Sequence, residues 1–105
     1  MTERRNEPLA PSDRDVVDLG ELCMILELRS EVVCEWVAEG VVRPAGRRLG
    51  EWRFTADELE RARRARRLQR DLDLNTASLP LVLDLLGEVE HLRRRLRVLE
   101  DRFFE

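Results

Sequence analysis

Apolar residues recur at helical spacing in several stretches of the chain, and these stretches define the expected elements. The first runs from Leu19 to about Leu26, with Asp18 placed to cap a short helix. The second runs from Ser30 to Gly40, where Ser30 suits an N-cap and Gly40 a left-handed C-cap. Two short helices joined by a tight turn predict a helix-turn-helix.

The second expected helix carries two different faces. Its apolar residues fall on one side at helical period and are Val32, Val33, Trp36 and Val37. A second face is wholly acidic and consists of Glu31, Glu35 and Glu39. In a helix-turn-helix protein this is the helix that enters DNA, yet here it carries three carboxylates and no basic residue.

The middle of the chain predicts a small wing and a third helix. An extended segment begins at Val41, a turn rich in glycine and arginine follows, and residues 51–54 alternate polar and aromatic side chains. Thr55 and Glu58 form a capping-box pattern in which Thr55 caps the helix and Glu58 reaches back. The helix that they open is expected to run to about Asp71.

The last expected helix begins near Leu79 and extends to Arg102. It carries apolar residues at alternating spacings of three and four, the a and d positions of a heptad: Val82, Leu85, Val89, Leu92, Leu96, Leu99 and Phe103. Valine at two of the a positions and leucine at every d position favour a two-stranded coiled coil, hence a homodimer. A parallel pair, an antiparallel pair and packing of the helix on its own domain all fit the pattern.

Charge is distributed unevenly over the 105 residues. The net charge is −3, and all nineteen basic residues are arginine. Residues 1–42 hold ten acidic residues against four arginines, whereas residues 43–70 hold four against ten. Because binding to duplex DNA depends on neutralising phosphates, the acidic first part argues against sequence-specific DNA binding through the second helix. The basic wing and third helix leave non-specific contact open.

Little in the sequence indicates catalysis or a metal site. Cys23 and Cys34 are eleven residues apart and read as small buried thiols rather than zinc ligands. His91 falls at an outward position of the heptad helix. There is no glycine-rich phosphate loop, so no enzyme and no cofactor are expected. No apolar run is long enough to span a membrane and no signal-peptide core is present, so we expect a cytoplasmic protein.

Several runs of residues carry a resemblance to a known family. They are the stretch from Trp36 to Pro44, the motif Trp52-Arg53-Phe54-Thr55, the segment from Leu68 to Asn75 and the leucine-rich stretch from Leu81 to Leu92. Together they resemble the winged helix-turn-helix of MerR-type regulators and, within that group, the chaperone modulator CbpM family, over about residues 17–100. Glu27 and Arg29 stand where such proteins often have a glycine and a capping serine.

The resemblance implies a mainly α fold, a MerR-like winged helix-turn-helix with a two-stranded wing and a C-terminal coiled-coil helix. We expect a flexible tail at 1–15, the winged domain at 16–75 and a dimerisation or packing arm at 76–105. The resemblance also implies that the chain is an adaptor, which binds the J-domain of a CbpA/DnaJ-like co-chaperone and occludes the surface that DnaK needs.

Since the second helix of a J-domain is strongly basic, the expected contact residues are Glu31, Glu35, Glu39 and, as an aromatic anchor, Trp36. The alternative is a MerR-type repressor of heat-shock genes, because that branch shares the segment from Leu68 to Asn75.

Overall fold

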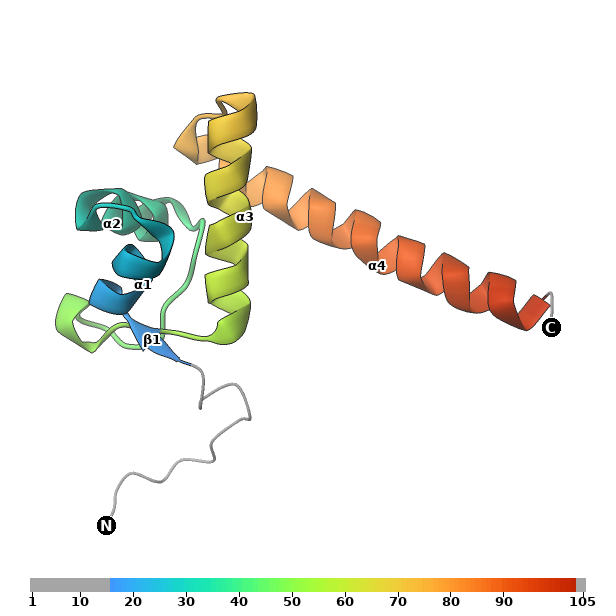
Figure 1. The fold of residues 1–105 in the computed structure, drawn as a ribbon, viewed down its shortest axis with the longest axis horizontal. Helices are drawn as coiled ribbons and strands as arrows, with labels where there is room; N and C mark the ends of the chain where they lie inside the picture. The colour runs from blue at the N-terminus through green and yellow to red at the C-terminus, as the bar shows by residue number, and fades with distance from the viewer. Residues whose placement is uncertain (1–15, 104–105) are drawn as a thin grey trace, which may run out of the picture.

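The first three helices pack around one core, and a long fourth helix leaves it as an arm (Figure 1). The computed structural model describes residues 16–103, so the expected tail at 1–15 lies outside the described residues. The elements in chain order are β1 Val17–Asp18, α1 Leu19–Leu26, α2 Ser30–Glu39, the 3₁₀ turn η2 Leu49–Glu51, β2 Arg53–Phe54, α3 Ala56–Leu72, the 3₁₀ turn η3 Thr76–Ser78 and α4 Leu79–Phe103. The expected helices are therefore confirmed.

The α1–α2 unit is a helix-turn-helix whose caps explain its short helices. Asp18 and Glu21 form a reciprocal capping box at the start of α1, each side chain accepting a backbone N–H at 2.8 Å. Glu27 ends α1 in the left-handed region with φ 57°, a conformation that favours glycine. The N-cap of α2 is Arg29, without a side-chain hydrogen bond. The expectation that Ser30 is the N-cap was therefore wrong by one residue.

The sheet has the expected two antiparallel strands but a different partner for β2. Strand β2 pairs with β1, placing Val17 opposite Phe54 and Asp18 opposite Arg53. The segment after Gly40 does not form the first strand, because Val41 and Val42 are both buried, which the alternation of a half-exposed strand would not allow. Only Ala45 reaches β2 from that side, exchanging hydrogen bonds of 2.8 and 3.0 Å with Arg53.

The start of α3 fixes the connection that precedes it. Thr55 accepts a hydrogen bond from the Glu58 backbone N–H at 3.2 Å, so its predicted role as the cap is confirmed. The prediction that Glu58 reaches back to Thr55 was wrong, because its carboxylate accepts the backbone N–H of Arg43 at 2.9 Å instead. This bond holds the chain leaving α2 against the first turn of α3.

A single core lies between α1, α2, α3 and the start of α4. Its buried apolar residues are Leu22, Leu26, Val33, Trp36, Val41, Val42, Phe54, Ala62, Ala65, Leu79 and Leu83. Two alanines on α3 allow the other helices to approach that helix closely, so the large side chains of α2 and β2 fill the centre.

The arm is buried in the core at its first two turns. Leu79 and Leu83 are buried in the core, while every residue of α4 from Gly87 to Phe103 is exposed. Two ion pairs also join α3 to α4: Arg61 to Asp84 at 3.1 Å and Arg64 to Glu90 at 2.7 Å. Among residues 16–103, no helix combines the length and the apolarity that crossing a bilayer requires.

Candidate functional site

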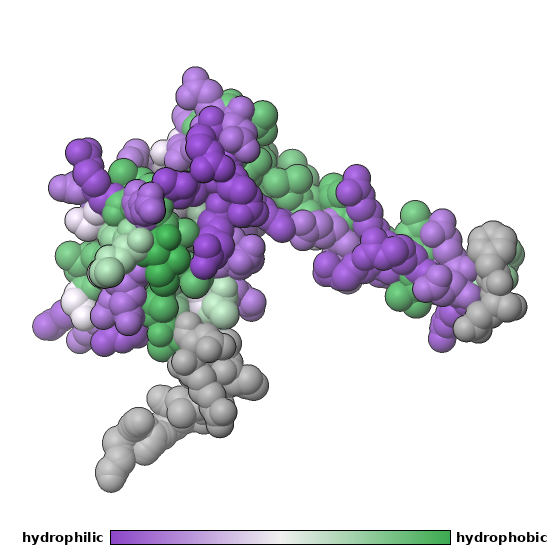
Figure 2. Space-filling view, in the orientation of Figure 1, coloured by the Kyte–Doolittle hydropathy of each residue, from purple (hydrophilic) through white to green (hydrophobic). Residues whose placement is uncertain are grey.

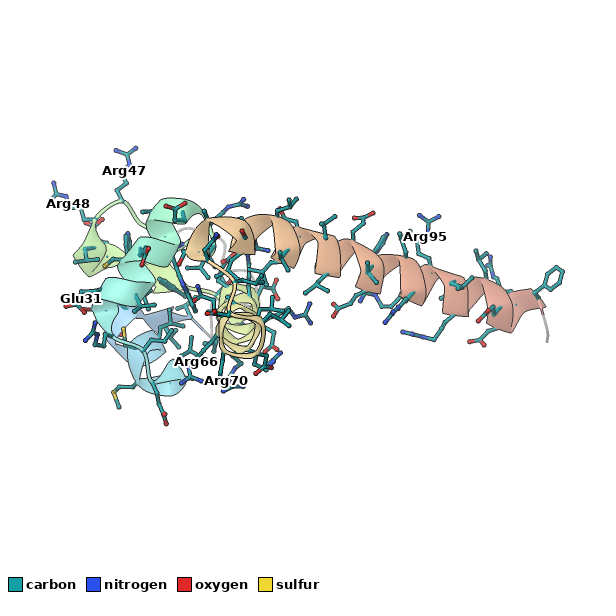
Figure 3. The ribbon with its side chains drawn as sticks, turned by 90° about the horizontal axis from the view of Figure 1, so that it is seen from above. Glu31, Arg47, Arg48, Arg66, Arg70 and Arg95 are labelled. Carbon is teal, nitrogen blue, oxygen red and sulfur yellow. The ribbon has the colours of Figure 1, made fainter. Side chains whose placement is uncertain are left out.

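The outer side of α2 presents an unpaired acidic surface, which we call the acidic face: Glu31, Glu35 and Glu39. All three side chains are exposed, and none forms an ion pair with any residue in 16–103. Figure 3 shows Glu31 projecting from α2 into solvent. The opposite side of α2 buries Val33 and Trp36, so core packing holds the carboxylates outward.

Trp36 does not belong to this surface, although it was expected there as an aromatic anchor. Its side chain is only 1% exposed and is the largest fully buried side chain of the core. A residue this deeply buried cannot touch a partner while the domain stays folded. The Nε1–H group of the indole has no hydrogen-bond partner among the described residues, which indicates that the ring is kept for its volume and apolar area rather than for a polar contact.

Helix α1 presents an exposed apolar side chain that sequence reasoning missed. Met24 is 80% exposed. The residue before it, Cys23, has a thiol that lies close enough to Glu31 for the carboxylate to affect the pKa of the thiol. Burial raises the pKa of the Cys23 thiol, and the neighbouring Cys34 and Glu31 raise it further. Because an exposed flexible methionine adapts to many apolar surfaces, Met24 is suited to an apolar contact with a partner. The signal was available, since Met24 falls outside the apolar face of α1.

Basic residues gather elsewhere, on the wing and on α3. Arg47 and Arg48 extend from the turn before η2, away from the acidic face (Figure 3). A duplex approaching the wing and α2 together would meet these arginines and also the three carboxylates of α2. Binding to a duplex depends on neutralising its phosphates, and α2 presents only carboxylates as charged groups.

The arm carries an exposed apolar seam, formed by the expected heptad residues. Val82 is half-buried, and the others are between 42% and 82% exposed: Leu85, Val89, Leu92, Leu96, Leu99 and Phe103. Figure 2 shows hydrophobic residues interleaved with hydrophilic ones along the arm. A row of large apolar side chains of this length on a single helix is typical of an interaction surface.

The two cysteines and the histidine do not form a site in the described part of the chain. Cys23 and Cys34 are partly buried free thiols, and His91 is exposed on α4. Within residues 16–103, no group of three or more histidine, cysteine, aspartate or glutamate side chains is arranged to hold a metal ion.

Comparison with known proteins gives one family and a consistent group of relatives. Residues 17–101 match the family model of the MerR HTH family regulatory proteins. The chain is 38% identical over 82 residues to the "Chaperone modulatory protein CbpM" of Coxiella burnetii (strain Dugway 5J108-111), covering 78% of this chain and 77% of that protein. It is 36% identical over 86 residues to the protein of the same name from Pseudomonas putida (strain W619), covering 82% and 85%.

Proposed function

This chain belongs to the MerR HTH family and to its chaperone-modulatory CbpM branch, and on that premise we propose that it is a non-catalytic adaptor for the J-domain of a CbpA/DnaJ-like co-chaperone. The proposed contact is the acidic face, Glu31, Glu35 and Glu39, together with the exposed Met24 of the adjoining helix α1. Binding there would cover the J-domain surface that DnaK needs, so the co-chaperone would be inhibited by occlusion.

The observation that carries this proposal is the exposed, unpaired state of the three carboxylates. Each lies free on the helix that a DNA-binding relative would insert into the groove. The family resemblance implies a J-domain as the partner, and the second helix of a J-domain is strongly basic, so its charge is complementary to that of the acidic face. Complementary charged surfaces accelerate encounter and fix orientation more than they add affinity.

The burial of Trp36 changes the expected character of the interface. Without an aromatic anchor, the surface consists of three carboxylates and one exposed methionine. Interfaces with few buried anchors depend more on charge. We therefore expect the affinity for the J-domain to fall steeply with added salt, since exposed charges are screened beyond about 10 Å at 0.1 M ionic strength.

Isothermal titration calorimetry with the J-domain tests this proposal. The single variant Glu35→Lys should weaken binding about fivefold and the triple Glu31→Lys/Glu35→Lys/Glu39→Lys about a hundredfold or more. Asp101→Lys on α4 makes the same charge change as Glu35→Lys at an exposed site on another element, so it should leave the affinity unchanged. Unchanged binding by the triple variant, or an equal loss in Asp101→Lys, would refute the acidic face as the contact.

The competing function, a repressor that reads DNA through the same helix, predicts the opposite response. A gel shift with the chain's own promoter at moderate salt should show no specific complex if the adaptor proposal is correct. Tight operator binding that the triple variant abolishes would replace the adaptor by a repressor.

We further propose that residues 76–105 form a homodimerisation arm attached to a winged domain at 16–75. The seam residues from Leu85 to Phe103 expose on the order of 600 Å² per protomer, near the area that each partner contributes to a standard-sized interface. In a parallel pair, Glu88 would meet Arg93 of a second copy and Arg95 would meet Glu100. None of these four has an ion-pair partner among the described residues, so each is available.

Sedimentation equilibrium measures this association directly. The parent chain should be a dimer at micromolar concentration. Leu92→Glu places a charge at the centre of the seam and should yield a monomer, whereas Arg94→Glu, at an outward heptad position, should remain dimeric. A monomeric parent would refute the arm as a dimer interface and would leave the J-domain proposal intact.

A further inference from the structure

The arginines on the two sides of α3 differ in whether they form ion pairs within the fold. Toward α4, Arg61 and Arg64 each pair with a carboxylate of the arm. Arg61 also donates through Nε to the carbonyl oxygen of Val41 at 2.6 Å. The charge on this side is therefore used inside the fold, to hold the arm and the segment after α2.

On the opposite side, α3 and the end of α1 enclose a surface pocket of about 220 Å³, the basic pocket. Its lining consists of Ile25, Leu26, Glu27, Arg63, Arg66 and Arg67. Neither Arg66 nor Arg67 pairs with a carboxylate among the described residues, and the only such contact of Arg63 is a long one to Glu60, at 3.8 Å. The Nε–H group of Arg66, labelled in Figure 3, is buried without a hydrogen-bond acceptor.

We propose that the basic pocket binds a short peptide segment in which a carboxylate side chain stands next to an apolar one. A guanidinium presents paired N–H donors that match the two oxygens of a carboxylate, and such pairs are stronger than neutral hydrogen bonds. An incoming carboxylate would lie among the guanidinium groups of Arg63, Arg66 and Arg67, which have no close carboxylate partner among the described residues. Ile25, 43% exposed although its helical position suggests the core, provides an apolar wall beside the charge.

The lining favours a peptide over nucleic acid. Ile25 gives the mostly polar pocket one exposed apolar side chain, which a sugar-phosphate backbone could not match with an apolar group of its own. Glu27 also lines the pocket, and α2 with its three free carboxylates packs directly against α1. A duplex is extended and uniformly negative, so it would meet these acidic groups as well. A short peptide can place one carboxylate among the arginines and stay clear of α2.

This site lies on a different face from the proposed J-domain contact and is independent of it. The acidic face would take a basic partner, and the basic pocket an acidic segment. The chain would then hold two chemically opposite ligands on adjacent sides of one helix-turn-helix.

Fluorescence anisotropy with labelled synthetic peptides tests the proposal. The probe is a short peptide of alternating glutamate and leucine, compared with one in which glutamine replaces every glutamate and one in which serine replaces every leucine. The parent chain should bind the first peptide at least about tenfold more tightly than either of the others. Arg67→Glu, at an exposed position, should weaken binding about tenfold or more, and Arg94→Glu on α4, with the same charge change, should leave it unaltered.

Several results would overturn the proposal. They are no measurable binding of the first peptide, equal affinity for the glutamine or serine peptide, an equal loss in Arg94→Glu, or displacement of the peptide by duplex DNA at lower concentration. The last result would make the pocket a nucleic-acid contact. The two proposals fail separately, because Arg67→Glu should keep its affinity for the J-domain and the triple glutamate variant should keep its affinity for the acidic peptide.

Discussion

Replacing Trp36 by phenylalanine separates a core role from a binding role for the residue at the centre of α2. The side chain is 1% exposed, and its Nε1–H has no acceptor among the described residues. Phenylalanine keeps an aromatic ring at the position but removes the N–H group and part of the volume. Alanine at the same position removes the whole ring and serves as the reference for losing the packing.

The two substitutions should differ widely in their effect on the free energy of unfolding. Exchanging indole for phenyl leaves roughly 40 Å³ empty, which costs about 1 kcal/mol at the usual penalty for a partly relaxed cavity. The same exchange removes a buried N–H donor that has no partner. Burying this donor destabilises the parent by about 1–3 kcal/mol, so its removal should stabilise the variant by that amount. These terms oppose each other, so the free energy of unfolding of Trp36→Phe should lie within about 2 kcal/mol of that of the parent. Trp36→Ala should lose about 3–5 kcal/mol.

Urea unfolding followed by far-UV circular dichroism gives these values at one fixed protein concentration, because association through the arm would make stability depend on concentration. The J-domain titration is then repeated with the folded Trp36→Phe protein, and the affinity should equal that of the parent. A loss of 3 kcal/mol or more in Trp36→Phe would show that the indole nitrogen makes a stabilising bond. A large loss of J-domain affinity at unchanged stability would return Trp36 to the interface.

Further predictions concern the wing, the arm and the thiols. Gly46 has φ 102°, and a Cβ atom there would lie 2.5 Å from the backbone oxygen of Glu51, so Gly46→Ala should destabilise the domain by about 1–3 kcal/mol in the same urea assay. Gly87 lies inside α4 with no atom near the added Cβ; Gly87→Ala should stabilise by about 0.5–1 kcal/mol, and a loss would indicate a contact at that position in the assembled protein. Because burial raises the pKa of Cys23, its thiol should react with iodoacetamide at neutral pH more slowly than free cysteine. Mass spectrometry should show faster alkylation of Cys23 after Glu31→Gln, which removes a negative charge that raises this pKa; an unchanged rate would contradict the assigned cause.

Local sequence signals were sufficient for the helices but not for the strand pairing. Gly40 and Thr55 mark their helix ends through chemistry that involves only a few neighbouring residues. The partner of β2 is decided over a much longer range, since Val17 pairs with Phe54 across most of the domain. Glu58 illustrates the same limit: the pattern gives it a local acceptor role, and the fold supplies a better-placed donor in Arg43.

The candidate site was predictable where it depends on helical period alone. The spacing of Glu31, Glu35 and Glu39 places them on one side of α2, and the structure leaves all three exposed. The helical period placed Trp36 with Val32 and Val33 on the apolar side, which allowed core packing as well. It was nevertheless named as an anchor because aromatic residues are enriched in interfaces, and this statistical tendency was a weaker guide than the period. The exposure of Met24 could have been read from its place outside the apolar face of α1, whereas the basic pocket depends on how α1 packs against α3, which the sequence pattern does not specify.

The distribution of roles within α2 explains how one scaffold can serve opposite partners. The core depends on Val33 and Trp36, which fall on the buried side, whereas the acidic face occupies every fourth position on the other side. Neither set constrains the other, because the glutamates make no contact that the fold needs among the described residues. The sign of this surface can therefore change without cost to the packing that defines the MerR-like domain. It follows that fold similarity within the family fixes the shape of the surface, while the charge of three exposed side chains decides whether that surface suits a duplex or a basic protein.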